Sequence, residues 1–135
     1  MKLLKLLLVL PALLAIAQLS AEIHPKYYAE MQQSAPEKLE IEVKDVNSGW
    51  CFFWCGSREI EIEAIVTKVT KSASGLTIGQ SIQICYTHFT PGNGWAGPRP
   101  IPILKEDRKY PAYLSKDSDA CYSPAARGYS FESVD

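Results

Sequence analysis

Six consecutive residues combine thiols with large aromatic rings, and they form the densest chemical feature of the 135-residue chain. Residues 50–55, here called the aromatic segment, read Trp-Cys-Phe-Phe-Trp-Cys. A disulfide between the two cysteines would close a short bulge. Its rings would then either fill one end of the fold or project as a rigid binding surface. The candidate binding residues of this segment are Trp50, Phe52, Phe53 and Trp54.

The same two cysteines allow two kinds of reactive site. Thiol–disulfide oxidoreductases place two residues between their cysteines at a helix N-terminus, whereas three residues separate Cys51 from Cys55. A tetrahedral zinc site could use both of them with Cys85 and His88, but it would leave Cys121 without a partner. A thiol-redox or zinc-binding protein centred on Cys51 and Cys55 is therefore the alternative to a structural role.

A second candidate surface is the proline loop, residues 90–102, which contains four prolines together with Trp95 and Arg99. Tryptophan and arginine are the residue types most common at binding hot spots, and stiff loops often carry function. Arg127 is a further arginine close to an aromatic residue. If the fold brings the arginines together, we expect Arg99 and Arg127 to reach an anionic ligand. The alternative is a stiff connection that only covers the barrel.

The sequence offers little support for catalysis. It has no Gly-x-Ser-x-Gly elbow and only two histidines that could act as a base. Its closely spaced carboxylates recur at every second residue, which places them on the solvent face of strands instead of in a cleft. These carboxylates are Glu40 and Glu42 in one set, and Glu59, Glu61 and Glu63 in the other. We expect a non-catalytic protein without a cofactor or a metal.

The first 21 residues have the order of a secretory signal peptide. Two lysines precede an apolar run broken by one proline, and small residues then lead to Ala21. The apolar run is shorter than the roughly 20 residues that span a bilayer. We predict removal of residues 1–21, with cleavage after Ala17 as the alternative. Residues 22–135 would then form a single exported domain, periplasmic or secreted, that does not span a membrane.

The charge of the exported part is small and dispersed. Both leader lysines would be lost, so 12 of the 14 basic residues remain against 15 acidic ones, a formal charge of −3. No basic patch of the kind that binds nucleic acid is visible. The expected partner is a protein or a glycan.

All four cysteines lie in the exported part, where oxidation into two disulfides is the first expectation. Among three possible pairings we favour Cys51–Cys55 with Cys85–Cys121, because the first pair is close in sequence. In the chain-entropy model the longer loop is worth about 4 kcal/mol and the shorter about 2 kcal/mol. The longer bridge would then stabilise the fold, and the shorter would shape a surface.

Hydrophobic periodicity predicts the elements that position these residues. A short helix is expected over residues 22–34, where Pro25 suits the first turn. Alternation of apolar and polar residues predicts strands over residues 39–44, 59–66, 82–86, 110–114 and 129–134. Turns are expected at 47–49 and 72–75 and a bend at 123–127, and residues 76–78 are a possible start of the third strand.

These elements predict a mainly β fold: a small antiparallel barrel of five or six strands with one short N-terminal helix. Residues 59–86, with a long strand, a turn at Gly75, Gly79 and a following strand, resemble the oligonucleotide/oligosaccharide-binding (OB) barrel. Within that class the chain resembles the secreted netrin-like modules of tissue inhibitors of metalloproteinases. Those inhibitors chelate the protease metal with an N-terminal cysteine, whereas Glu22 would begin this mature chain. Their inhibitory chemistry therefore does not carry over.

Overall fold

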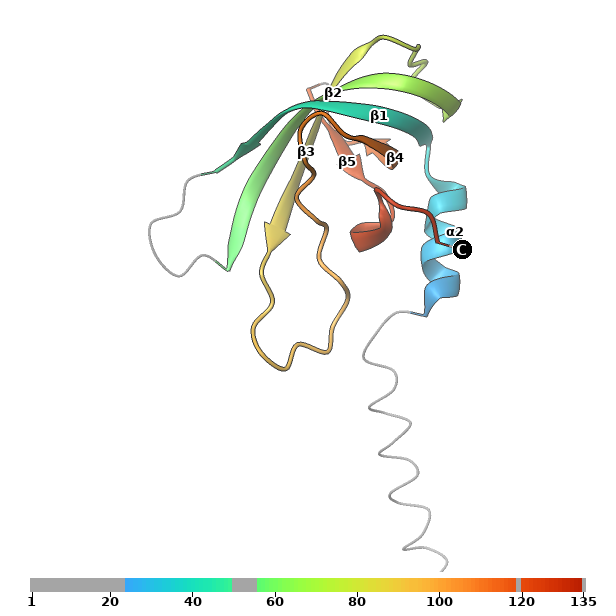
Figure 1. Ribbon diagram of the computed structural model, residues 1–135. Helices are drawn as coiled ribbons and strands as arrows, with labels where there is room; N and C mark the ends of the chain where they lie inside the picture. The colour runs from blue at the N-terminus through green and yellow to red at the C-terminus, as the bar shows by residue number, and fades with distance from the viewer. Residues whose placement is uncertain (1–23, 50–55, 119, 135) are drawn as a thin grey trace, which may run out of the picture.

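The computed structural model describes residues 24–49, 56–118 and 120–134 and shows a mainly β fold with one α-helix (Figure 1). The expected fold class is confirmed. In chain order the elements are α2 (Pro25–Ser34), β1 (Glu37–Ser48), β2 (Ser57–Ser72), β3 (Ser81–Phe89), β4 (Lys109–Lys116), β5 (Tyr122–Pro124) and the 3₁₀ helix η1 (Arg127–Tyr129).

The five strands form a closed barrel in the order β1-β2-β3-β5-β4. Four neighbouring pairs are antiparallel, and β3 with β5 is the parallel pair. That parallel ladder has a single registered pair, Ile84 with Tyr122. The junction between β3 and β5 is therefore the part of the barrel with the shortest backbone pairing.

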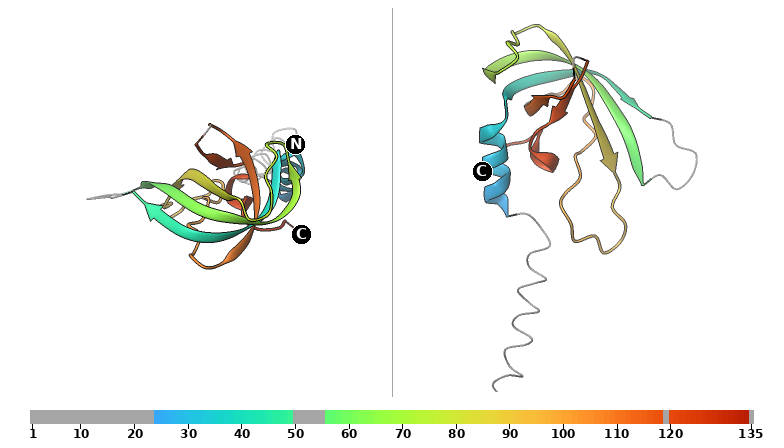
Figure 2. Two further views of the ribbon diagram at one scale, coloured as in Figure 1. Left: turned by 90° about the horizontal axis from the view of Figure 1, so that it is seen from above. Right: turned by 180° about the vertical axis from the view of Figure 1, so that it is seen from behind.

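The long hairpin of β1 and β2 wraps around the barrel because its register shifts three times, near Leu39, Ile41 and Val43. Such irregularities bend a strand and increase its twist, and the curvature is visible from above in Figure 2. Both strands are longer than the sequence predicted. Asn47 and Ser48, expected to break β1, still pair with β2.

The alternation that predicted the strands also builds the core. In β2, alternate residues from Ile60 to Val66 are at most 1% exposed, and the glutamates between them face solvent. The inward side chains of β1, β3 and β4 join them in one cluster, which Leu76, Leu104 and Phe131 complete from connecting segments. Leu76 is thus buried in the core although it lies outside the strands. The third strand begins only at Ser81, and not at residues 76–78.

Helix α2 lies against the C-terminal segment, as Figure 1 and the right view of Figure 2 show. His24 caps its N-terminus by accepting a hydrogen bond from the Lys26 N–H, and Pro25 follows in the first turn. Tyr28 and Gln32 form its buried side. The Tyr28 ring packs on Tyr129 with centroids 4.4 Å apart.

The predicted last strand over residues 129–134 is wrong. After β5 the chain turns into η1, because the Ser130 side chain replaces the ladder bonds of a strand: it accepts from the Ala126 N–H and donates to the Arg127 carbonyl. Phe131 then enters the core, where it is 4% exposed. The alternating apolar and polar residues of this segment therefore lie in a compact turn and not in a strand.

The predicted signal peptide, residues 1–21, and the aromatic segment lie outside the described residues, so both stay predictions. Over the described ranges, the structure contains no helix that combines the length and the apolar character needed to cross a membrane.

Candidate functional site

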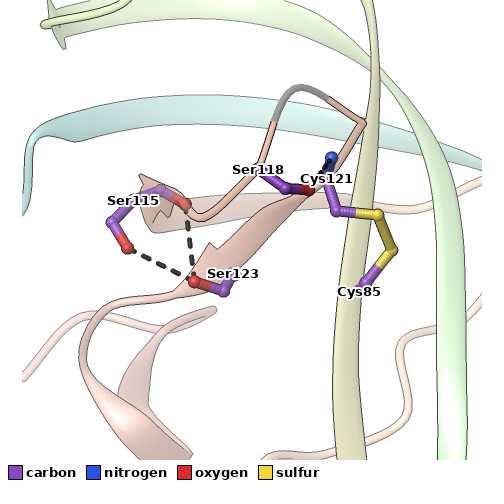
Figure 3. Close-up of a disulfide and its surroundings, with 5 residues drawn as sticks. All are labelled: Cys85, Ser115, Ser118, Cys121 and Ser123. Carbon is purple, nitrogen blue, oxygen red and sulfur yellow. Dashed lines mark hydrogen bonds between the residues drawn. A yellow bond between two sulfur atoms is a disulfide. The ribbon is translucent and has the colours of Figure 1, made fainter.

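A disulfide links the neighbouring strands β3 and β5, which share the shortest backbone ladder of the barrel. Cys85 of β3 is bonded to Cys121, the residue before β5, with their Cα atoms 5.7 Å apart (Figure 3). These cysteines follow and precede the paired residues Ile84 and Tyr122. The predicted Cys85–Cys121 bridge is confirmed, and it holds β5 where backbone pairing alone is least extensive.

This bridge excludes the zinc site considered from the sequence, because the Cys85 sulfur is already bonded to Cys121. The fourth ligand of that set is also engaged: His88 Nδ1 lies 2.7 Å from the Ile101 carbonyl oxygen and donates to it. Within residues 24–49, 56–118 and 120–134, no group of three or more His, Cys, Asp or Glu side chains is placed to hold a metal ion. Cys51 and Cys55 lie outside these ranges.

The proline loop is attached to η1 through Arg99. Its guanidinium donates to the Gly128 carbonyl at 2.7 Å and forms an ion pair with Glu132. The same group lies over the Tyr129 ring, 4.2 Å from its centroid, in a cation–π contact. These three contacts fix the loop to the C-terminal segment.

Strand β3 holds the C-terminal end of the loop, next to Arg99. The Tyr86 hydroxyl donates to the Pro102 carbonyl at 2.7 Å, next to the bond from His88 to Ile101. Burial raises the pKa of the Tyr86 phenol to about 12, so the hydroxyl stays a donor throughout the neutral range. Residues 99–102 are therefore held between η1 and β3, although the loop contains no regular secondary structure.

Trp95 folds back on its own loop and forms one wall of a pocket. Its indole N–H donates to the Pro98 carbonyl at 3.1 Å, and its ring meets Phe89 edge-on with centroids 5.3 Å apart. The ring occupies the place that a Cβ on Gly97 would take, so glycine at this position permits the fold-back. Half of the Trp95 side chain stays exposed.

The proline-loop pocket is an open cavity of about 360 Å³ between this loop, the end of β3 and the β5–η1 turn. Its described lining comprises Thr87, Phe89, Trp95, Pro98, Arg99, Pro100, Ile101, Pro124 and Arg127. The volume lies at the lower end of the range for small-molecule sites, and the predominance of apolar residues is typical of them. The structure thus brings together Trp95, Arg99 and Arg127, all three predicted from sequence.

The two arginines differ in their contacts. Arg99 is occupied by Glu132, Gly128 and the Tyr129 ring. Arg127 is exposed, and its guanidinium makes no ion pair or hydrogen bond with any side chain or backbone group of the described ranges. Both arginines line the same pocket, and Arg127 is the one whose guanidinium donors are unoccupied among the described residues.

A second groove of about 430 Å³ lies across β1, β2 and β3. Its lining includes the carboxylates Asp45, Glu61 and Glu63 with the amides of Asn47 and Gln83. The predicted solvent exposure of the β2 glutamates is confirmed. This groove is polar and acidic, in contrast to the apolar and basic proline-loop pocket.

Several residues that shape the pocket were missed from sequence. Gly128 allows η1 to approach the proline loop, and Pro124 and Phe89 supply apolar walls. Gln32 of α2 donates to the carbonyls of Tyr129 and Glu132, at 2.8 and 2.7 Å, and so positions the partners of Arg99. No local motif marks Gln32, because its partners are about 100 residues away in the chain.

Comparison with known proteins gives no relative from which a function could be transferred. The chain matches no protein-family model, no curated protein and no solved structure. The assignment of a function therefore depends on the geometry of the proline-loop pocket.

Proposed function

We propose that this protein is an exported, non-catalytic binding module whose ligand site is the proline-loop pocket. The observation that carries the proposal is the convergence of Trp95, Arg99 and Arg127 around one open apolar cavity. An aromatic ring and an arginine in a preformed pocket are the groups that contribute most to affinity at binding sites.

The rigidity of the pocket supports binding as its role. The contacts of Arg99 with η1 and of Tyr86 with Pro102 fix the end of the loop, and Pro98 and Phe89 hold Trp95, before any ligand arrives. A preformed site loses little conformational entropy on association. The ionisable residues of the described lining are the two arginines. Because arginine does not deprotonate in proteins, they suit ligand recognition better than proton transfer.

Export is part of the proposal. The leader over residues 1–21 has the composition of a signal peptide, and a structural disulfide such as Cys85–Cys121 persists in oxidising compartments. The predicted second disulfide, Cys51–Cys55, would require the same oxidising environment.

The resemblance to OB barrels does not lead us to propose nucleic acid as the ligand. OB barrels often bind oligonucleotides on the face of strands 2 and 3. Here the groove on that face carries Asp45, Glu61 and Glu63, whose charges repel phosphates. The aromatic segment, with Trp50, Phe52, Phe53 and Trp54, stays a predicted additional surface for a protein or glycan.

The test is a ligand-detected NMR screen of the mature, oxidised chain with a set of small aromatic and alicyclic fragments. We expect several fragments to bind the wild type and to lose most of their binding in Trp95→Ala, because that variant removes a wall of the pocket. Ile78→Ala is the matched control, since Ile78 is an apolar side chain 70% exposed on a turn and outside the pocket lining.

Loss of the NMR signals in W95A together with their retention in I78A would support the pocket as the binding site. Equal binding by W95A and the wild type, or no fragment bound by the wild type, would contradict it. Circular dichroism of both variants verifies that they are folded.

A further inference from the structure

We propose that the ligand of the proline-loop pocket is a small amphipathic acid, in which one carboxylate is attached to a flat apolar body. The inference rests on the proposed function and specifies the chemistry of its ligand. The apolar body would lie along Trp95 and the prolines, and the carboxylate would bind the guanidinium of Arg127.

The shape of the lining supports a flat apolar body. Proline and tryptophan present planar or nearly planar faces, and the pocket contains the indole of Trp95 and the rings of Phe89, Pro98, Pro100 and Pro124. An aromatic ring gains a further contribution when it packs against the indole of Trp95 or the ring of Phe89. Because Trp95 is held by Pro98 and Phe89, its face is already oriented.

The charge distribution supports an anion. No aspartate or glutamate is among the described lining residues. The nearby carboxylate of Glu132 is paired with Arg99, and that of Glu59 accepts a hydrogen bond from Thr87. Arg127 therefore contributes a positive charge that no described group neutralises, and a guanidinium binds a carboxylate through two parallel hydrogen bonds.

The backbone that carries Arg127 is held in a defined conformation. Arg127 adopts a left-handed conformation with φ of 49°, which residues other than glycine seldom adopt without a local requirement. Its carbonyl accepts from both the N–H and the hydroxyl of Ser130, at 3.2 and 2.7 Å. Its neighbours Ala126 and Gly128 are buried, so the Cα position is anchored while the guanidinium stays in solvent.

The test compares two probes of equal shape that differ in charge, 2-naphthylacetate and 2-naphthylacetamide. Binding to the oxidised chain is followed by the NMR shift of the Trp95 indole N–H at low ionic strength. We expect the acid to bind roughly three- to tenfold more tightly than the amide, the size of a partly exposed charge-assisted contact. The ratio falls as salt is added, because salt screens the attraction.

Three arginine variants assign the preference. Arg127→Gln lowers the acid-to-amide ratio to about one, and Arg127→Lys, which keeps the charge, retains a preference for the acid. Arg108→Gln is the matched control, because Arg108 is exposed and outside the pocket lining; it leaves the ratio unchanged. Persistence of the full ratio in R127Q would overturn the inference.

The outcomes separate this inference from the proposed function. If the acid and the amide bind the wild type equally and both shift the Trp95 signal, the proposed preference for an acid is refuted, but the proposal that the pocket is a binding site stands. If neither probe shifts the Trp95 signal, the result counts against both the acidic ligand and the binding function of the pocket. Tighter binding of a capped dipeptide ending in a free phenylalanine carboxylate than of naphthylacetate would assign the carboxylate to a peptide terminus and overturn the small acid.

Discussion

Gly128 lies directly against the backbone of Arg99: a Cβ at Gly128 would stand 2.5 Å from the Arg99 carbonyl oxygen. The reverse contact is a hydrogen bond from the Arg99 guanidinium to the Gly128 carbonyl. The proline loop and η1 are thus joined by backbone proximity as well as by side-chain bonds. This close approach lies next to the proline-loop pocket, which Arg99 and Arg127 both line.

Replacing Gly128 with alanine should separate the loop from η1. Two backbone segments cannot absorb the added methyl group without moving, so we expect G128A to lose about 1–3 kcal/mol of unfolding free energy, as overpacked sites do. Urea unfolding followed by fluorescence measures the change. Gly92→Ala is the control, because a Cβ at Gly92 meets nothing within 4 Å. Equal stability of G128A and G92A would contradict the close packing.

Gln32→Leu should detach the C-terminal segment from α2. The leucine keeps the helix and its apolar contacts but leaves the carbonyls of Tyr129 and Glu132 without their donor, a loss of about 2 kcal/mol. Gln33→Leu, on the exposed side of the same turn, should change stability by no more than about 0.5 kcal/mol. Amide hydrogen exchange across residues 127–134 should rise in Q32L alone. Unchanged exchange there would contradict the role of Gln32.

Removing the Cys85–Cys121 disulfide should destabilise the barrel at the junction of β3 and β5. The bridge closes a loop with a sequence separation of 36, for which the chain-entropy model gives about 4 kcal/mol. We expect the unfolding free energy of the double variant Cys85→Ala, Cys121→Ala, measured by urea unfolding, to be lower by that amount. Its fastest new hydrogen exchange should occur around Ile84 and Tyr122. A loss below about 1 kcal/mol would show that the short ladder suffices by itself.

Tyr86 should make stability depend on alkaline pH. Its pKa is raised from 10.0 to about 12 by burial, so the folded state holds the phenolic proton more tightly than the unfolded state. That contribution is complete below pH 10 and is lost as the pH rises toward 12. Tyr86→Phe should therefore flatten the decline of unfolding free energy over this range.

The control for that measurement is Tyr27→Phe, because Tyr27 is 54% exposed on α2. Y27F should decline with pH as the wild type does, since the two proteins share the lysines and other tyrosines that also titrate there. An identical slope in Y86F and Y27F would refute the effect of Tyr86 burial. At neutral pH, Y86F should also lose about 1 kcal/mol with its hydrogen bond to Pro102.

Strands β1 to β4 were predictable because their central residues alternate, whereas β5, which closes the barrel, lies where a bend was expected. Residues such as Ile41, Ile62 and Ile84 are fully buried, and their polar neighbours face outward. A period of two leaves little freedom for another arrangement. The strand over residues 129–134 failed because the hydroxyl of Ser130 completes a compact turn, a local bond that periodicity does not reveal.

The candidate site was predicted only at the level of residue types. Trp95, Arg99 and Arg127 were recognised because such residues are common in binding sites, and the structure does place them around one pocket. Their unequal roles were not predictable, because the partner that occupies Arg99 is Glu132, 33 residues further along the chain. Which arginine keeps its donors available is decided by tertiary contacts.

The position of β5 has a consequence for how the chain reaches its final form. This three-residue strand lies between β3 and β4 and is, in chain order, the last of the described strands. A nascent chain that has emerged only as far as Lys116 already contains β1 to β4 but lacks the piece that joins β3 to β4. The ring can close only after residues 122–124 have been synthesised, so completion of the barrel follows the synthesis of β1 to β4.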